Sequence, residues 1–272
     1  MMVMGIDFTS RPTRRKPLTC MHCTLEGRVL QAGSLEEWPD FAPFEEALKK
    51  PGPWIAGIDF PFGQSRIFIE NIGWPSYWVG YVEHARSLGR KGFRSALDAY
   101  REQRLFGDKE HRRVTDIAAS SISPQKLYGV PVGLMFFEGA PRLLQSGVTI
   151  PMLQSGDPSR IVVEAYPGVL ARQLIGRTGY KNDSRGKQTE EKHKTRRTML
   201  DQILNGQIEA SYGLRVQAPK SLADDPSGDQ LDALLCAIQA AWAWTMREHR
   251  YGAPANVDPL EGWIADPSLS GK

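Results

Sequence analysis

The chain of 272 residues contains few cysteines and no long apolar run. Its three cysteines, Cys20, Cys23 and Cys236, are too few and too odd in number for a disulfide framework, which favours a reducing compartment. No apolar segment approaches the length that spans a bilayer. Asp7 stands too early for a secretory signal peptide. We therefore expect a cytoplasmic protein that does not use a membrane.

Common nucleotide-binding and zinc motifs are also missing. The sequence has neither a Walker-type phosphate loop nor a dinucleotide-binding glycine fingerprint. The segment Cys20-Met21-His22-Cys23 has the spacing of half a zinc site, but no second pair follows it. On a strand Cys20 and Cys23 would point to opposite faces, so we expect them to pack rather than to bind zinc.

The net charge of +3 conceals three basic stretches. Residues 84–126 hold ten Lys or Arg against five Asp or Glu, and residues 172–197 hold nine against three. The third stretch, residues 11–16, contains four basic side chains. Gathered on one face, these stretches would attract a polyanion such as nucleic acid. Dispersed, they are ordinary solvated surface charge, and the sequence favours neither interpretation.

Apolar residues make up 41% of the chain and charged residues 24%, as in ordinary globular proteins. The length fits one α/β domain, residues 1–272. The apolar patterns predict five strands, at residues 3–8, 18–25, 28–32, 54–60 and 161–165. Helices are expected at residues 38–50, 77–88, 93–106, 109–119, 169–175, 195–204 and 230–248. We interpret residues 64–159 as a largely helical insertion between the fourth and fifth strands.

Three of the expected strands place an acid at or near their ends, namely Asp7, Asp59 and Glu164. A charge on a buried strand is costly unless it is paired or bound to metal. If these strands are parallel neighbours, the acids converge at the carboxyl edge of the sheet. Crowded carboxylates repel one another, and Mg²⁺ or Mn²⁺ with oxygen ligands removes that repulsion.

Two further acids, Asp229 and Asp232, begin the last expected helix and lie on the same side of it. Asp232 is the better candidate ligand, because it stands one turn into the helix beside the buried stripe. Each acid also has a structural alternative. Asp7 and Asp59 can shape turns, Ser227 or Asp229 can cap the last helix, and Glu164 can pair with a basic residue such as Arg172.

Four segments resemble the predicted RNase H-like nuclease family, which has long been catalogued as a domain of unknown function. They are Gly5-Ile6-Asp7-Phe8-Thr9-Ser10, Gly57-Ile58-Asp59-Phe60-Pro61-Phe62-Gly63, Glu164-Ala165-Tyr166-Pro167-Gly168 and Asp229-Gln230-Leu231-Asp232-Ala233-Leu234-Leu235-Cys236-Ala237. Two segments of the insertion, residues 107–113 and 123–126, also resemble the family. The resemblance covers nearly the whole chain.

The resemblance implies an RNase H-like core with a mixed five-stranded sheet flanked by helices. It also implies a nuclease that cleaves phosphodiester bonds with two metal ions, by its similarity to Holliday junction resolvases. Catalysis is then expected of Asp7, Asp59, Glu164 and Asp232, and metal binding of Asp7, Glu164, Asp229 and Asp232. The chain departs from the resolvase pattern at Asp59, where that pattern often has Glu.

The basic insertion supplies the expected contacts to nucleic-acid phosphates, which are Lys109, His111, Arg112, Arg113 and Lys126. Four aromatic residues of the insertion have a spacing that fits base stacking or packing in a helical core, and we favour the core: Trp74, Tyr77, Trp78 and Tyr81. Two other functions remain compatible with the fold. One is a phosphotransferase or nucleotide hydrolase, and the other is a non-catalytic module that binds nucleic acid or a partner.

Overall fold

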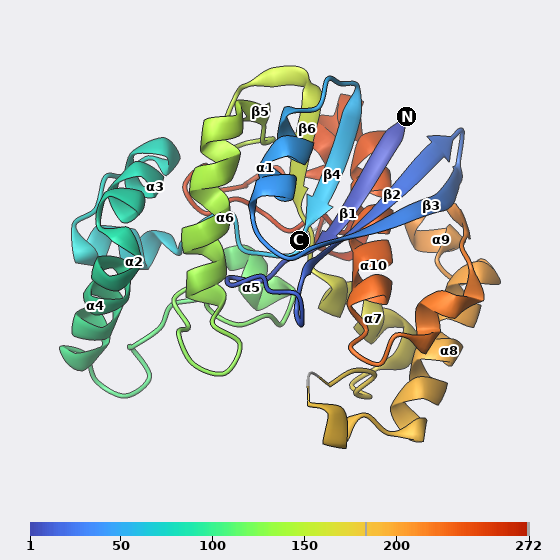
Figure 1. Cartoon of the computed structure of the whole chain (residues 1–272). Coiled ribbons are helices and arrows are strands. Elements are labelled where there is room, and N and C mark those ends of the chain that lie inside the picture. The colour runs from blue at the N-terminus through green and yellow to red at the C-terminus, as the bar shows by residue number, and fades with distance from the viewer. Residues whose placement is uncertain (183, 271–272) are drawn as a thin grey trace.

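The computed structural model describes residues 1–182 and 184–270, which form a mixed α/β fold around one sheet (Figure 1). The sheet has seven strands in the order β5-β6-β4-β1-β2-β3-β7. Their bounds are Met2–Asp7 (β1), Leu18–Glu26 (β2), Val29–Trp38 (β3), Trp54–Ile58 (β4), Val148–Thr149 (β5), Asp157–Glu164 (β6) and Arg215–Gln217 (β7). The prediction of five strands was therefore wrong in number, because both edge strands, of two and three residues, are too short to show a pattern.

Strands β6, β4 and β1 are parallel neighbours in the centre of the sheet. Strand β2 pairs antiparallel with β1, β3 pairs antiparallel with β2, and β7 closes the edge parallel to β3. Since parallel strands end at the same edge, the carboxyl ends of β1, β4 and β6 lie together at the lower edge of the sheet in Figure 1.

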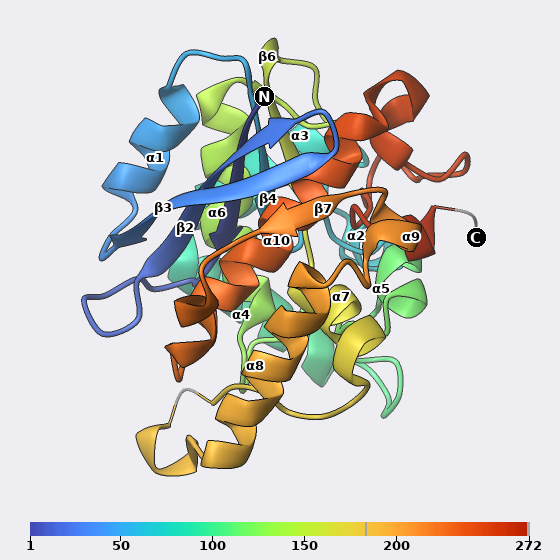
Figure 2. The same ribbon diagram turned by 90° about the vertical axis from the view of Figure 1, so that its right-hand side faces the viewer.

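Helices cover both faces of the sheet (Figures 1 and 2). One face packs against α1 and α6 with the rest of the insertion, and the other against α10, α7 and α8. The α-helices are Ala42–Lys49 (α1), Arg66–Ile72 (α2), Trp78–Ser87 (α3), Gly89–Glu102 (α4), Val114–Ala118 (α5), Val132–Ser146 (α6), Pro167–Ile175 (α7), Glu190–Leu204 (α8), Glu209–Tyr212 (α9) and Asp229–Thr245 (α10). Short 3-10 helices occur at Arg185–Lys187, Lys220–Asp224, Arg247–Gly252 and Pro267–Leu269.

Helix α10 lies directly on the two central strands because each has a glycine beneath it. A Cβ atom at Gly5 of β1 would stand 1.9 Å from the carbonyl oxygen of Ala233, and one at Gly57 of β4 would stand 2.4 Å from that of Cys236. No side chain fits in either space. The repeated Gly-Ile-Asp sequence of these strands therefore combines a close helix contact with an acid two residues later on the same face.

The insertion is less helical than predicted at one point. The basic helix expected at residues 109–119 is wrong, since only α5 forms there and residues 103–113 are turns and loop. The expected start of a helix at Trp38 is also wrong, because this residue ends β3. The prediction that the aromatic group packs in the core is confirmed for Trp74, Trp78 and Tyr81, whereas Tyr77 is exposed.

Within the described residues, none of the helices combines the length and the apolar character that crossing a bilayer requires.

Candidate functional site

Asp7 and Asp59 lie side by side at the carboxyl edge of the sheet. Asp7 ends β1, Asp59 directly follows β4, and the backbone N–H of Asp59 donates to the carbonyl oxygen of Ile6 at 3.0 Å. Each acid stands two residues beyond a glycine that contacts α10. Strand alternation therefore turns both carboxyl groups toward α10, as the parallel order of the strands predicted.

The first turn of α10 brings two more carboxyl groups to the same place. Asp229 and Asp232 are 8% and 1% exposed. Asp229 does not cap the helix, because Gly228 occupies that position and Asp225 accepts a hydrogen bond from the backbone N–H of Gln230 at 3.1 Å. Asp229 and Asp232 therefore lie beside Asp7 and Asp59, and the N-terminus of α10 favours their negative charge.

A lysine that the sequence did not single out stands among these acids. Lys181 lies between α7 and α8, and its ammonium group donates to Oδ2 of Asp232. The neighbouring Tyr180 hydroxyl donates to Oδ1 of the same carboxylate at 2.5 Å. Burial lowers the pKa of Lys181, but attraction to Asp232 and Asp7 outweighs it and the net pKa is raised. We call Asp7, Asp59, Asp229 and Asp232 the acid cluster, and Lys181 is its resident cation.

Burial and mutual repulsion oppose the ionisation of the acid cluster. Burial raises the pKa of Asp7 well above its ordinary value, and repulsion from the other three acids adds to the effect while Lys181 opposes it. Burial likewise raises the pKa of Asp59 to about 7, with a further contribution from Asp232. The pKa of Asp229 is raised for the same first reason. One lysine therefore neutralises the cluster incompletely.

The donor set fits a hard divalent cation in its chemistry, since carboxylate oxygens are the ligands that Mg²⁺ and Mn²⁺ prefer. In the arrangement with Lys181 in place, however, no three His, Cys, Asp or Glu side chains among residues 1–182 and 184–270 converge to hold a metal ion. The ammonium group of Lys181 supplies the positive charge beside these carboxylates instead. A metal ion would have to replace this ammonium group and draw the carboxylates inward.

Glu164 does not point into the acid cluster, although it is near enough to Asp59 to raise the pKa of that carboxyl group. In the register of the sheet it is paired with Ile58 rather than with Asp59, and Ile58 packs in the core on the α6 side. Alternation therefore turns Glu164 toward the insertion, on the opposite face from Asp7 and Asp59. A shift of one residue in register therefore turns Glu164 to the other face of the sheet from these acids, although Glu164 and Asp59 line the same cavity.

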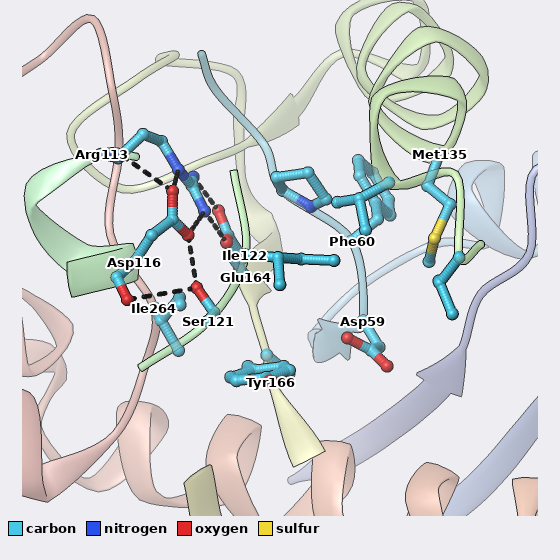
Figure 3. A pocket seen from close by; sticks show the side chains of 14 residues that line it. Asp59, Phe60, Arg113, Asp116, Ser121, Ile122, Met135, Glu164, Tyr166 and Ile264 are labelled. Carbon is cyan, nitrogen blue, oxygen red and sulfur yellow. Dashed lines mark hydrogen bonds and ion pairs between the residues drawn. The ribbon is translucent and has the colours of Figure 1, made fainter. Parts of the chain in front are cut away.

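Glu164 is held instead by Arg113, which is 1% exposed (Figure 3). The two terminal nitrogens of Arg113 donate to the two oxygens of Glu164 at 2.7 and 2.6 Å. The same guanidinium group donates twice to Asp116 at 2.9 Å, and the backbone N–H of Phe62 donates to Glu164 at 2.8 Å. This buried ion-pair network joins the insertion to β6. Glu164 therefore pairs with a basic residue, which was the structural alternative to metal binding, but the partner is Arg113 rather than Arg172.

The five residues expected to contact phosphates are found in different environments. Lys109 and Arg112 are exposed, while Arg113 is buried in its ion pairs. The His111 side chain is only 9% exposed, and its Nε2 lies 2.7 Å from the Tyr100 hydroxyl. Lys126 is half-buried over a tyrosine ring. The exposed cationic groups of this set are therefore those of Lys109 and Arg112.

A second basic segment borders the acid cluster directly. The loop between β1 and β2 begins immediately after Asp7, and its Arg11, Arg14 and Arg15 are exposed. Lys16 of this loop is near enough to lower the pKa of Asp229. Positive charge from this loop therefore reaches the acid cluster on the side where β1 ends.

Replacing Asp59 by Asn should stabilise the protein in EDTA at pH 8 and have little such effect at pH 4. The folded-state pKa of about 7 exceeds the ordinary value of 3.8, so stability from this group is full below pH 4 and is lost as the pH rises through 7. The Asn variant cannot ionise and escapes that loss. Melting temperatures of both proteins across this range test the expectation, and a constant difference would refute it.

The chain matches one known protein family. The family described as "Protein of unknown function (DUF429)" matches residues 5–258 of this chain. That range contains the acid cluster, Lys181 and the Arg113 network. No curated protein and no solved structure matches the chain.

Proposed function

We propose that this chain, which belongs to the DUF429 family, is a metal-dependent nuclease with an RNase H-like core that hydrolyses phosphodiester bonds of nucleic acid. The observation that carries the proposal is the acid cluster: four carboxyl groups from β1, β4 and α10 gathered around a single ammonium group. So many buried acids are costly for a fold unless a cation binds them.

Asp7, Asp59 and Asp232 would hold Mg²⁺ or Mn²⁺, with Asp229 at the rim. Lys181 reaches the cluster from a segment between two helices and keeps its side chain 36% exposed, so it can swing outward without disturbing the sheet. When bound, two such ions supply an activated water and stabilise the leaving oxygen of a phosphodiester. Glu164 would support the site through Arg113 rather than as a ligand.

The exposed basic residues of the chain would hold the nucleic-acid strand by its phosphates. Arg11, Arg14 and Arg15 follow Asp7 along the chain, and Lys109 and Arg112 belong to the insertion. Contacts from such side chains to phosphates fix the position of a strand without reading its sequence. Binding should therefore weaken steeply as salt is raised.

The proposal is tested by cleavage of end-labelled single-stranded and duplex DNA and RNA in Mg²⁺ or Mn²⁺. We expect the wild type to cleave at least one of these substrates and Asp7→Asn to cleave none, while its circular dichroism stays that of the wild type. Asp98→Asn, which changes an acid on α4 whose side chain is 47% exposed, is the matched control and should retain activity. Cleavage by Asp7→Asn at the wild-type rate would overturn the proposal.

A further inference from the structure

A small cavity adjoins the acid cluster (Figure 3). It has a volume of about 240 Å³ and lies between the Arg113 network and α6. Asp59 lines it at one end together with Tyr166, so the same carboxyl group borders both the cavity and the cluster. Anything bound in the cavity therefore lies next to the proposed reaction site.

Two aromatic rings form walls of the cavity, and each is seated on a glycine. A Cβ atom at Gly139 of α6 would stand 2.4 Å from Cζ of Phe60, and one at Gly168 would stand 2.7 Å from Cζ of Tyr166. A side chain at either glycine would push the ring away. Both rings are thus held in place by close contact with bare backbone. Phe60, which is 2% exposed, backs the cavity wall from the core, whereas the half-buried Tyr166, with the Arg172 guanidinium 5.4 Å from its ring centroid, is the ring that a ligand can reach.

The floor of the cavity does not attract phosphate. Among residues 1–182 and 184–270, the one cation that lines it is Arg113, whose guanidinium group is already shared between Glu164 and Asp116. Ser121, which also lines the cavity, donates its hydroxyl to Asp116 at 2.7 Å. Two carboxylates against one guanidinium repel an anion, so the occupant is an uncharged group with an apolar surface.

The mouth of the cavity carries apolar side chains exposed to solvent. Ile122 is 42% exposed and Val130 is 58% exposed, and both line the cavity. Single exposed apolar residues are common, but here two of them frame a cavity whose walls are also apolar. This pattern is typical of a site that receives a flat, weakly polar ligand.

We propose that this cavity takes one unpaired nucleobase of the substrate, while the phosphate attached to that nucleotide lies at the acid cluster. The inference rests on the proposed function. Sites for drug-sized ligands have volumes of roughly 300–1,000 Å³, so the smaller cavity accommodates a single ring system and excludes a base pair. A base reaches it only where the strand is unpaired or where the base leaves the stack. The enzyme therefore selects single-stranded or locally unpaired nucleic acid.

The test compares four substrates of one sequence in Mg²⁺: a single strand, a full duplex, a duplex with one unpaired base, and that duplex with an abasic site at the unpaired position. We expect the wild type to cleave the unpaired-base duplex about tenfold or more faster than the full and abasic duplexes, as stacking of one base on an aromatic ring implies. Tyr166→Phe should keep this ratio, and Tyr166→Ala should bring it close to one.

Ile122→Ala is the second variant, because an exposed loop residue can be truncated without unfolding the protein, and it should reduce the ratio partially. Equal cleavage of the unpaired-base and abasic duplexes by the wild type would overturn the base site and leave the nuclease intact. If no substrate is cleaved, the nuclease proposal fails instead. The cavity is then judged in EDTA by fluorescence quenching of an oligonucleotide containing 2-aminopurine: quenching lost in Tyr166→Ala supports the base site, and no quenching by the wild type refutes it.

Discussion

Replacing Gly5 by alanine is expected to destabilise the protein by about 3 kcal/mol or more. The new methyl group would stand 1.9 Å from the carbonyl oxygen of Ala233 and 2.3 Å from the amide nitrogen of Ala237. Both are backbone atoms of α10, so no side-chain rotation can relieve the clash. The helix must move, and it carries Asp229 and Asp232 with it, so any folded fraction should also lose metal binding.

Gly179→Ala is the matched control for this change. Gly179 has no atom within 4 Å of an added Cβ, and its φ is not positive, so its replacement should alter stability by no more than about 0.5 kcal/mol. Denaturant unfolding of both variants gives the comparison. A Gly5→Ala protein as stable as the control would show that α10 does not rest on β1 as described.

Replacing Arg113 by methionine should cost about 3–5 kcal/mol of stability, as is usual when one partner of a buried ion pair is removed. Arg113 is 1% exposed, and its loss leaves Glu164 and Asp116 facing each other in the interior. Burial raises the pKa of Glu164 and Arg113 opposes that rise, so the stability of this variant should recover in part as the pH is lowered and Glu164 is protonated.

The neighbouring Arg112 supplies the control, because it is exposed and Arg112→Met should leave stability nearly unchanged. The double variant Arg113→Met, Glu164→Gln should be more stable than Arg113→Met alone, since one of the two unpaired charges is gone. Denaturant unfolding midpoints decide the matter. Equal stability of the Arg112 and Arg113 variants would contradict the buried network.

The sequence predicts the part of the site that depends on strand pattern. Short apolar runs that end in Asp7 and Asp59 predict parallel strands with acids at one edge, and the structure brings these acids together with Asp229 and Asp232. Glu164 was grouped with them because it also ends a strand. Its register, in phase with Ile58, turns it to the other face. Because β4 is buried on both faces, the alternation of apolar and polar residues that usually specifies register is absent here.

Lys181 and the burial of Arg113 could not be predicted for a different reason. Both lie in basic stretches where neighbouring lysines and arginines look equivalent. Only the tertiary fold distinguishes Arg113, which is buried with Glu164, from Arg112, which is exposed. Similarly, the loop at residues 103–113 replaces an expected helix, because Arg113 must reach into the interior with extended backbone before α5 begins.

The central claim is that the acid cluster exchanges Lys181 for divalent metal, and the most direct test is the melting temperature during titration with Mg²⁺ or Mn²⁺. A ligand that binds only the native state raises the melting temperature by mass action. We predict a rise for the wild type, none for Asp7→Asn, and a rise at lower metal concentration for Lys181→Met, which lacks the competing ammonium group. No rise in the wild type and in Lys181→Met, or an equal rise in Asp7→Asn, would contradict the account.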